Sequence, residues 1–127
     1  MTDAALRAAG LSTRKIEYAR GLALATQTGT LLIDQLSGLE DAQVIEHITR
    51  LRGFGVWSAE IYCLFSLGRP DIFPADDLAL QIALARLKGL EVKPTPKAAR
   101  ALTQHWQPYR SAGALFLWHY YHEIPKV

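Results

Sequence analysis

Apolar residues recur along most of the chain at the three-to-four-residue spacing of a helix that buries one face. No segment alternates apolar and polar residues over five or more positions, as a half-buried strand would. The pattern therefore predicts an all-α fold, a compact bundle of short helices. Helices are expected at residues 13–28, around 31–36, after Asp41, at 56–67, from Asp76 or Asp77 to about 88, at 98–106 and from 110 to about 122.

Length and composition indicate one domain covering residues 1–127. Half of the residues are apolar and a fifth are charged, which excludes a disordered tail and a disulfide-stapled miniprotein. Cys63 is the only cysteine, so an internal disulfide and a four-thiolate iron–sulfur site are excluded. No apolar run approaches about eighteen residues and no signal-like start is present, so no membrane partner is expected.

The formal net charge of +2 is too small for a strong basic field over the whole chain. Between residues 78 and 122, however, six basic residues and one acidic residue leave a local excess of about +5. This distribution permits a polyanionic partner such as DNA without requiring one.

Two glycines stand one residue apart between two expected helices, in the stretch Leu51-Arg-Gly-Phe-Gly-Val-Trp-Ser-Ala59. Glycine permits a tight turn with outward-facing amides, and the following helix begins with unpaired N–H groups. Such a turn suits a DNA backbone phosphate. Gly-x-Gly alone could merely turn the chain, but Leu-x-Gly-x-Gly-x-x-x-Ala is the more specific helix-hairpin-helix pattern. The expected phosphate contacts are Arg52, Gly53, Phe54, Gly55 and Ser58, and the region from Lys93 to Arg100 is a further candidate.

The stretch Pro74-Ala75-Asp76-Asp77 places two carboxylates at the start of an expected helix, where the helix dipole stabilises negative charge. Each of them could be a simple helix N-cap, the commoner role for Asp at such a position. A fixed carboxylate can also stabilise the positive charge that develops on a sugar while a glycosidic bond breaks. The residues alone leave both roles open for both aspartates.

Together, the stretches 51–59 and 68–81 resemble the helix-hairpin-helix DNA glycosylase superfamily, and most closely its 3-methyladenine DNA glycosylase II branch. Segments 6–15 and 106–118 are similar to the same branch, so the resemblance covers nearly the whole chain. It implies a monofunctional enzyme that hydrolyses the N-glycosidic bond of alkylated bases in double-stranded DNA, in base excision repair. It also implies a location in the cytoplasm, with the nucleoid, of a bacterium, or otherwise in the nucleus.

The resemblance places the catalytic carboxylate at Asp77 and leaves Asp76 as the helix cap. Trp57 stands where bifunctional members carry a lysine, and because tryptophan cannot form a Schiff base, the implied nucleophile is water. Trp57, Trp118 and Tyr62 then line the pocket for a positively charged base. For Trp118, packing in the core is an equal alternative, because apolar residues surround it at helical spacing.

The resemblance implies no organic cofactor and no iron–sulfur cluster. Relatives often bind a monovalent cation through hairpin carbonyls, which here would be those of Thr49, Leu51 and Phe54. The four histidines lack a zinc-like pairing with cysteine, so no other metal is expected.

Relatives carry a substantial segment before the position equivalent to Met1, which supplies further helices and one wall of the pocket. Either the chain is a natural or engineered truncation, or a second chain provides the missing wall, and we expect a homodimer or a partner chain that supplies the missing N-terminal helices. Two interpretations compete with the glycosylase. One is a non-catalytic helix-hairpin-helix DNA-binding module, and the other is a helical interaction protein in which Gly53 and Gly55 only turn the chain.

Overall fold

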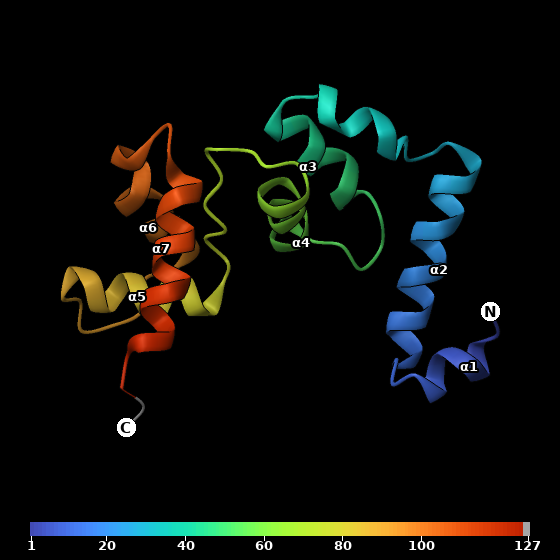
Figure 1. Ribbon diagram of the computed structural model, residues 1–127, viewed down its shortest axis with the longest axis horizontal. Coiled ribbons are helices and arrows are strands. Elements are labelled where there is room, and N and C mark those ends of the chain that lie inside the picture. The colour runs from blue at the N-terminus through green and yellow to red at the C-terminus, as the bar shows by residue number, and fades with distance from the viewer. Residues whose placement is uncertain (126–127) are drawn as a thin grey trace. The chain divides into compact units, whose positions relative to one another are not determined.

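The computed structural model describes residues 1–125, and the regular elements found there are all helical (Figure 1). The α-helices are α1 (Asp3–Ala8), α2 (Thr13–Thr28), α3 (Asp41–Thr49), α4 (Val56–Ile61), α5 (Leu78–Lys88), α6 (Pro96–Thr103) and α7 (Arg110–Glu123). Two 3₁₀-helices, η1 (Ile33–Gly38) and η3 (Gln104–Trp106), and one π-helical turn, η2 (Tyr62–Ser66), complete the set. The prediction of an all-α fold is confirmed.

Contacts divide the chain into two compact units, Met1–Gly55 and the residues from Val56 onward. We call them the N-terminal unit and the C-terminal unit. The expectation of a single domain stays a prediction.

Local capping explains why α2 matches its expected range. The Ser12 hydroxyl accepts a hydrogen bond from the Lys15 N–H at the start, and Gly29 ends the helix in the left-handed region with φ 81°. The helix α1 was not predicted, because it has no buried residue and therefore no apolar stripe. It is fastened to α2 by an ion pair of Arg20 Nε with Asp3 Oδ1 at 2.6 Å.

The buried apolar side chains of the N-terminal unit come from α2, from the segment after it, from η1 and from α3. These side chains are Ile16, Ala25, Leu31, Leu36, Val44 and Ile48.

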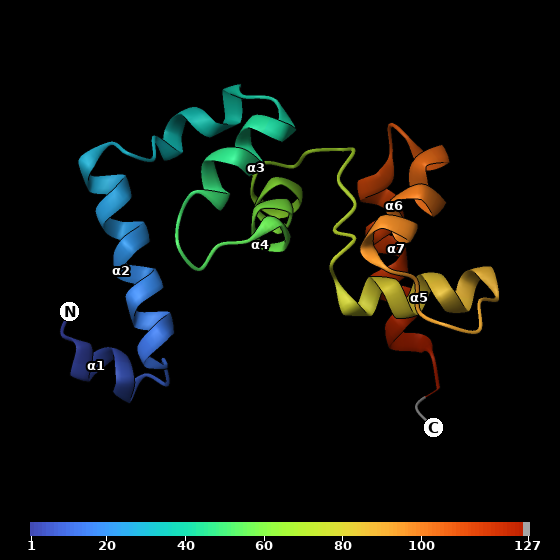
Figure 2. The same ribbon diagram turned by 180° about the vertical axis from the view of Figure 1, so that it is seen from behind.

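In the C-terminal unit, α5, α6 and α7 lie together in both views (Figures 1 and 2). Their packing buries Leu80 and Leu84 of α5 and Leu117 of α7 completely. The segment before α5 is irregular, with Phe73 outside any helix as the following Pro74 predicts, and Phe73 is buried. This packing brings the start of α5 against α7.

The helix expected at 56–67 is present, but it is not a regular α-helix throughout. After Ile61 the chain continues directly into the π-helical turn η2. A π turn uses i to i+5 hydrogen bonds and is rare outside single turns within helices, frequently at functional sites.

Candidate active site

Asp77 is the N-cap residue of α5. Its backbone is extended, with φ −74° and ψ 122°, and its Oδ1 accepts a hydrogen bond from the Leu80 N–H at 3.0 Å. The expectation that Asp76 caps this helix is therefore wrong, because Asp77 is the aspartate whose oxygen reaches the free N–H of the first turn. Asp76 is exposed, and its Oδ2 lies 3.9 Å from Nη2 of Arg100.

Two indole N–H groups point at the Asp77 carboxylate. Nε1 of Trp57 donates to Oδ2 at 2.8 Å, and Nε1 of Trp118 donates to Oδ1 at 3.2 Å. Together with the N–H of Leu80, three donors orient the carboxylate plane. An ionised carboxylate has about four lone-pair sites, so capacity remains for one further partner. The structure thus brings together three of the predicted site residues, from α4, α5 and α7.

Phe65 adds a third aromatic ring that the sequence analysis did not identify. Its ring stacks on that of Trp118, with centroids 5.5 Å apart and an interplanar angle of 26°. Phe65 is 60% exposed and Trp57 is 45% exposed, so both rings have surface left for a ligand. Phe65 lies in η2, whose wider turn displaces its side chain around the helix axis relative to an α-helix.

Tyr62 opens the same turn and is half-buried. Within residues 1–125 no hydrogen bond or ring contact joins it to Asp77, Trp57 or Trp118. Its assignment to the pocket stays a prediction.

Buried polar side chains fix the segment that leads to the N-cap of α5. The Ser111 hydroxyl donates to the Arg69 carbonyl at 2.6 Å and accepts from the Ile72 N–H at 2.8 Å. Nearer to α5, the Gln81 amide donates to the Ala75 carbonyl at 2.6 Å. Since buried polar groups are costly when unpaired, these bonds define one path for the backbone.

An ion pair joins the same segment to the start of α7. Nε and Nη2 of Arg110 donate to Oδ1 and Oδ2 of Asp71 at 2.8 and 2.9 Å, and the Arg110 backbone N–H donates as well. The hydrogen bonds from the guanidinium hold the pKa of Asp71 below its usual range, against a smaller opposing effect of burial.

The turn that follows α3 requires glycine at position 53. Gly53 has a left-handed φ of 90°, and a Cβ there would overlap the ring of Tyr18 on α2. The turn is closed by the Phe54 N–H, which donates to the Leu51 carbonyl at 3.1 Å. Gly55 has no left-handed φ, and a Cβ there would meet no described atom within 4 Å. The steric requirement therefore falls on Gly53 and not on both glycines.

Arg52, an expected phosphate contact, has an exposed side chain that is paired with α2. Its Nη1 lies 2.8 Å from Oε1 of Glu17. Ser58 belongs to the C-terminal unit, where it is half-buried in the first turn of α4. The phosphate contacts themselves stay predictions.

The expected cation would depend on backbone carbonyls of the turn. The Leu51 carbonyl accepts one hydrogen bond, which leaves it a lone pair for a monovalent cation beside the carbonyls of Thr49 and Phe54. This cation stays a prediction. Within the described residues, no cluster of three His, Cys, Asp or Glu side chains could hold a metal ion, and no helix is long and apolar enough to span a membrane.

Comparison with known proteins identifies the family of this chain. The model of the HhH-GPD superfamily of base excision DNA repair proteins matches residues 1–108. The chain is 34% identical over 114 residues to DNA-3-methyladenine glycosylase 1 of Schizosaccharomyces pombe. The aligned region covers 89% of this chain and 50% of that protein.

Two solved structures are similar as well. The S. pombe 3-methyladenine DNA glycosylase in complex with abasic DNA matches with a TM-score of 0.87 and 35% identity, over 93% of this chain and 58% of that chain. The DNA-3-methyladenine glycosidase of Bacillus halodurans matches with a TM-score of 0.82 and 37% identity, over 95% and 56%. The chain thus spans about half the length of these relatives. Since the family model covers most of the sequence and the fold agrees with it, the chain belongs to the HhH-GPD superfamily of base excision DNA repair proteins.

Proposed function

We propose that this chain carries the catalytic centre of a monofunctional DNA glycosylase that hydrolyses the N-glycosidic bond of alkylated, 3-methyladenine-type bases in double-stranded DNA. The observation that carries the proposal is the Asp77 carboxylate, which accepts hydrogen bonds from the indoles of Trp57 and Trp118 beside exposed aromatic rings. The relatives support it, since they are named for 3-methyladenine and one is bound to abasic DNA.

The carboxylate acts on the charge that develops during bond cleavage. As the C1′–N bond breaks, its electron pair leaves with the base and positive charge grows on the sugar. Asp77 is already oriented by three N–H donors, so it needs little reorganisation as that charge appears. At 4 Å and an effective dielectric of about 20, the gross attraction is about 4 kcal/mol. Water then supplies the oxygen that bonds to C1′ and releases a proton.

The residue at position 57 sets the type of reaction. An amine there could attack C1′, form a Schiff base and lead to strand cleavage. The indole of Trp57 has no such nucleophile, so the product is an abasic site in an intact strand.

The aromatic rings suit an electron-poor base that carries positive charge. An indole N–H lies in the ring plane, so the contacts with Asp77 do not cover the ring faces of Trp57 and Trp118, although Phe65 stacks on one face of Trp118. A cation over such a face gains about 0.5–2 kcal/mol. An alkylated base is also a good leaving group, which removes the need for a strong general acid.

DNA binding is assigned to the glycine turn, through Arg52, Gly53, Phe54, Gly55 and Ser58. Backbone amides and the Arg52 guanidinium contact phosphates without reading sequence. The target base must leave the helix stack, at a cost of a few kcal/mol, while these contacts hold the strand.

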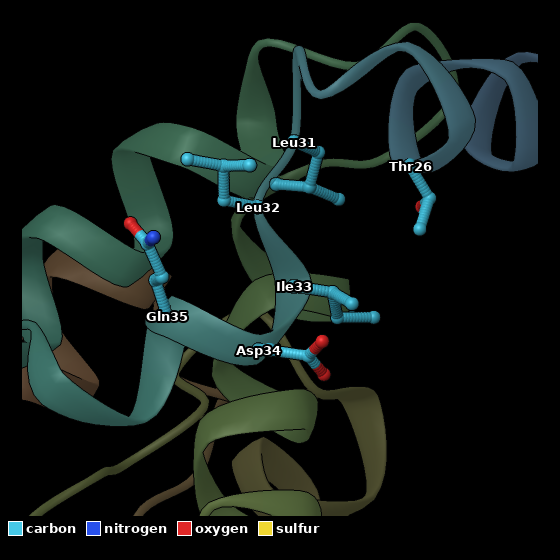
Figure 3. Close-up of a pocket in the computed structure, with 6 residues that line it drawn as sticks. All are labelled: Thr26, Leu31, Leu32, Ile33, Asp34 and Gln35. Atoms are coloured by element: carbon cyan, nitrogen blue, oxygen red, sulfur yellow. The ribbon is translucent and has the colours of Figure 1, made fainter.

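The protein associates with a second polypeptide, either another copy of this chain or a partner chain. An apolar surface of the N-terminal unit supports this proposal. Leu32 is 52% exposed and Ile33 39% exposed, and they line a pocket of about 180 Å³ (Figure 3). Exposed apolar patches of this kind commonly mark interaction sites. Sedimentation velocity is expected to show association, and a strictly monomeric profile with a cooperative thermal transition would contradict it.

A base-release assay tests the catalytic assignment. Wild-type protein incubated with methylated duplex DNA should release free alkylated bases, and Asp77→Asn should abolish the release. Asn can still cap the helix, but its single oxygen cannot accept from both indoles, so this variant should be less stable than wild type, and thermal unfolding verifies that it is folded at the assay temperature. The comparison is Asp76→Asn, which should keep a measurable release of base, because the indole hydrogen bonds go to Asp77.

Two results would change the assignment. Wild-type activity in Asp77→Asn would show that another group stabilises the sugar cation. Salt-dependent duplex binding with no base release by the wild-type protein would favour a non-catalytic DNA-binding module instead.

A further inference from the structure

A buried carboxylate on α4 has no part in the proposed chemistry. Glu60 is 4% exposed, and both of its oxygens are paired with Arg100 of α6. Nη1 of Arg100 donates to Oε2 at 3.3 Å, and Nη2 donates to Oε1 at 3.2 Å. The Arg100 side chain is 45% exposed, so the pair is only partly buried and its contribution to stability is modest. The Glu60–Arg100 pair is therefore a candidate for positioning the groups around it.

Arg100 also reaches the segment that leads to Asp77. Nη1 lies 3.5 Å from the Phe73 carbonyl oxygen, and Nη2 lies 3.9 Å from Oδ2 of Asp76. One guanidinium therefore bridges Glu60 to the backbone and to a side chain within the four residues before Asp77.

The contacts close a ring through α4. Trp57 and Glu60 are three residues apart on this helix, so their side chains lie on neighbouring positions of one face. Trp57 donates directly to Asp77, while Glu60 acts through Arg100 on residues 73 and 76. The segment that presents the carboxylate is thus tied to α4 at two points rather than one.

We propose that Arg100, paired with Glu60, is a positioning residue that sets where the Asp77 carboxylate lies relative to Trp57 and Trp118. The assignment rests on the proposed glycosylase function for its kinetic effect. Misplacement of a catalytic group by about 1 Å can cost as much as a hundredfold in rate. Loss of the Arg100 bridge is therefore expected to lower the single-turnover rate of base release about ten- to a hundredfold, with a much smaller change in duplex affinity.

The test compares Arg100→Met with Arg86→Met, an exposed arginine near the end of α5. Arg100→Met leaves Glu60 buried without its partner and could prevent folding. The double variant Glu60→Gln/Arg100→Met removes this unpaired charge, so the same measurements can be made on it. The first measurement is the ¹H–¹⁵N resonance of the indole N–H of Trp57 and of Trp118, with Asp77→Asn as reference. The second is the single-turnover rate.

Both Arg100 variants should shift the two indole resonances in the direction seen in Asp77→Asn, while Arg86→Met leaves them in place. In the double variant, thermal stability should recover while the rate stays low. Unchanged indole resonances in a folded Arg100 variant, or a rate that recovers together with stability, would overturn the proposal. If wild-type protein releases no base at all, the proposed function fails, but the resonances still decide the positioning role.

Discussion

The Asp77 side chain makes hydrogen bonds of two kinds, to the backbone of α5 and to two indoles. Helix capping occupies one lone pair of Oδ1 and leaves the rest of the carboxylate free. One aspartate can therefore cap the helix and act in the chemistry. The two roles need not be divided between Asp76 and Asp77. A residue that must keep one orientation gains from being a cap, since the helix start fixes its backbone.

The two glycines of the turn after α3 look equivalent in the sequence but have different surroundings in the structure. Gly53→Ala would place a Cβ at φ 90° and against the Tyr18 ring, so we expect a loss of about 1–3 kcal/mol in the free energy of unfolding. Gly55→Ala meets no described neighbour and should change it by less than about 1 kcal/mol.

Urea denaturation of the two variants measures this difference. Tyr18→Ala should restore part of the loss in Gly53→Ala, since it removes the overlap but not the backbone strain. Equal stabilities for the two glycine variants would contradict the steric account.

At the scale of elements, α4 and η2 form one helix whose hydrogen-bonding pattern changes midway. The change places Phe65 on Trp118 while Trp57, two turns earlier, reaches Asp77. A regular α-helix over the same residues would rotate Phe65 to a different position. The π turn therefore places Phe65 against Trp118, one of the two indoles that donate to Asp77.

Phe65→Ala tests whether the ring of Phe65 on Trp118 contributes to binding and turnover of the substrate. Base–aromatic stacking is worth about 1–3 kcal/mol, so kcat/KM for base release should fall by about 5- to 150-fold. Stability should change by less than about 1 kcal/mol, because the side chain is largely exposed.

Phe116→Ala is the matched control for this prediction. Phe116 is 54% exposed on α7 and stacks on Tyr120, with centroids 6.2 Å apart. Its removal should leave kcat/KM within about twofold of wild type, since it deletes a comparable stacked ring that no hydrogen bond or ring contact ties to Asp77. Equal losses in both variants would remove Phe65 from the substrate site.

At the scale of the whole molecule, the features that were predictable from sequence are those with local causes. Ser12 and Gly29 bound α2, and Gly89 ends α5, because capping depends on residues only a few positions away. The helix α1 was not predicted because it has no buried residue. The π-helical form of η2 was not predicted because the apolar pattern does not encode a change in hydrogen bonding.

The candidate site was predictable only in part, for a related reason. Asp77 and Trp57 lie in recognisable motifs. Glu60 and Arg100 are forty residues apart, and only tertiary packing shows that they meet. A glutamate within an apolar helical stretch was the one available signal, since such a residue is rarely buried without a partner.

Two carboxyl groups make opposite contributions to the pH dependence of unfolding. Hydrogen bonds from Arg110 lower the pKa of Asp71 below 3.8, so its contribution to stability is present above that pH and is lost as pH falls through the lowered value. Desolvation raises the pKa of Glu60 above 4.5, despite the opposing effect of Arg100, so its contribution is present below that pH and is lost as pH rises through the raised value.

Asp71→Asn and Glu60→Gln should therefore diverge when unfolding by urea is followed from pH 2.5 to 8. Asp71→Asn should be less stable than wild type by about 1.5–3 kcal/mol at neutral pH, because it loses charge-assisted hydrogen bonds, and the gap should narrow in acid. For Glu60→Gln, the difference from wild type should move in the variant's favour as pH rises from about 4. Parallel trends in the two variants would show that the Arg110 hydrogen bonds at Asp71 and the burial of Glu60 do not set these titrations.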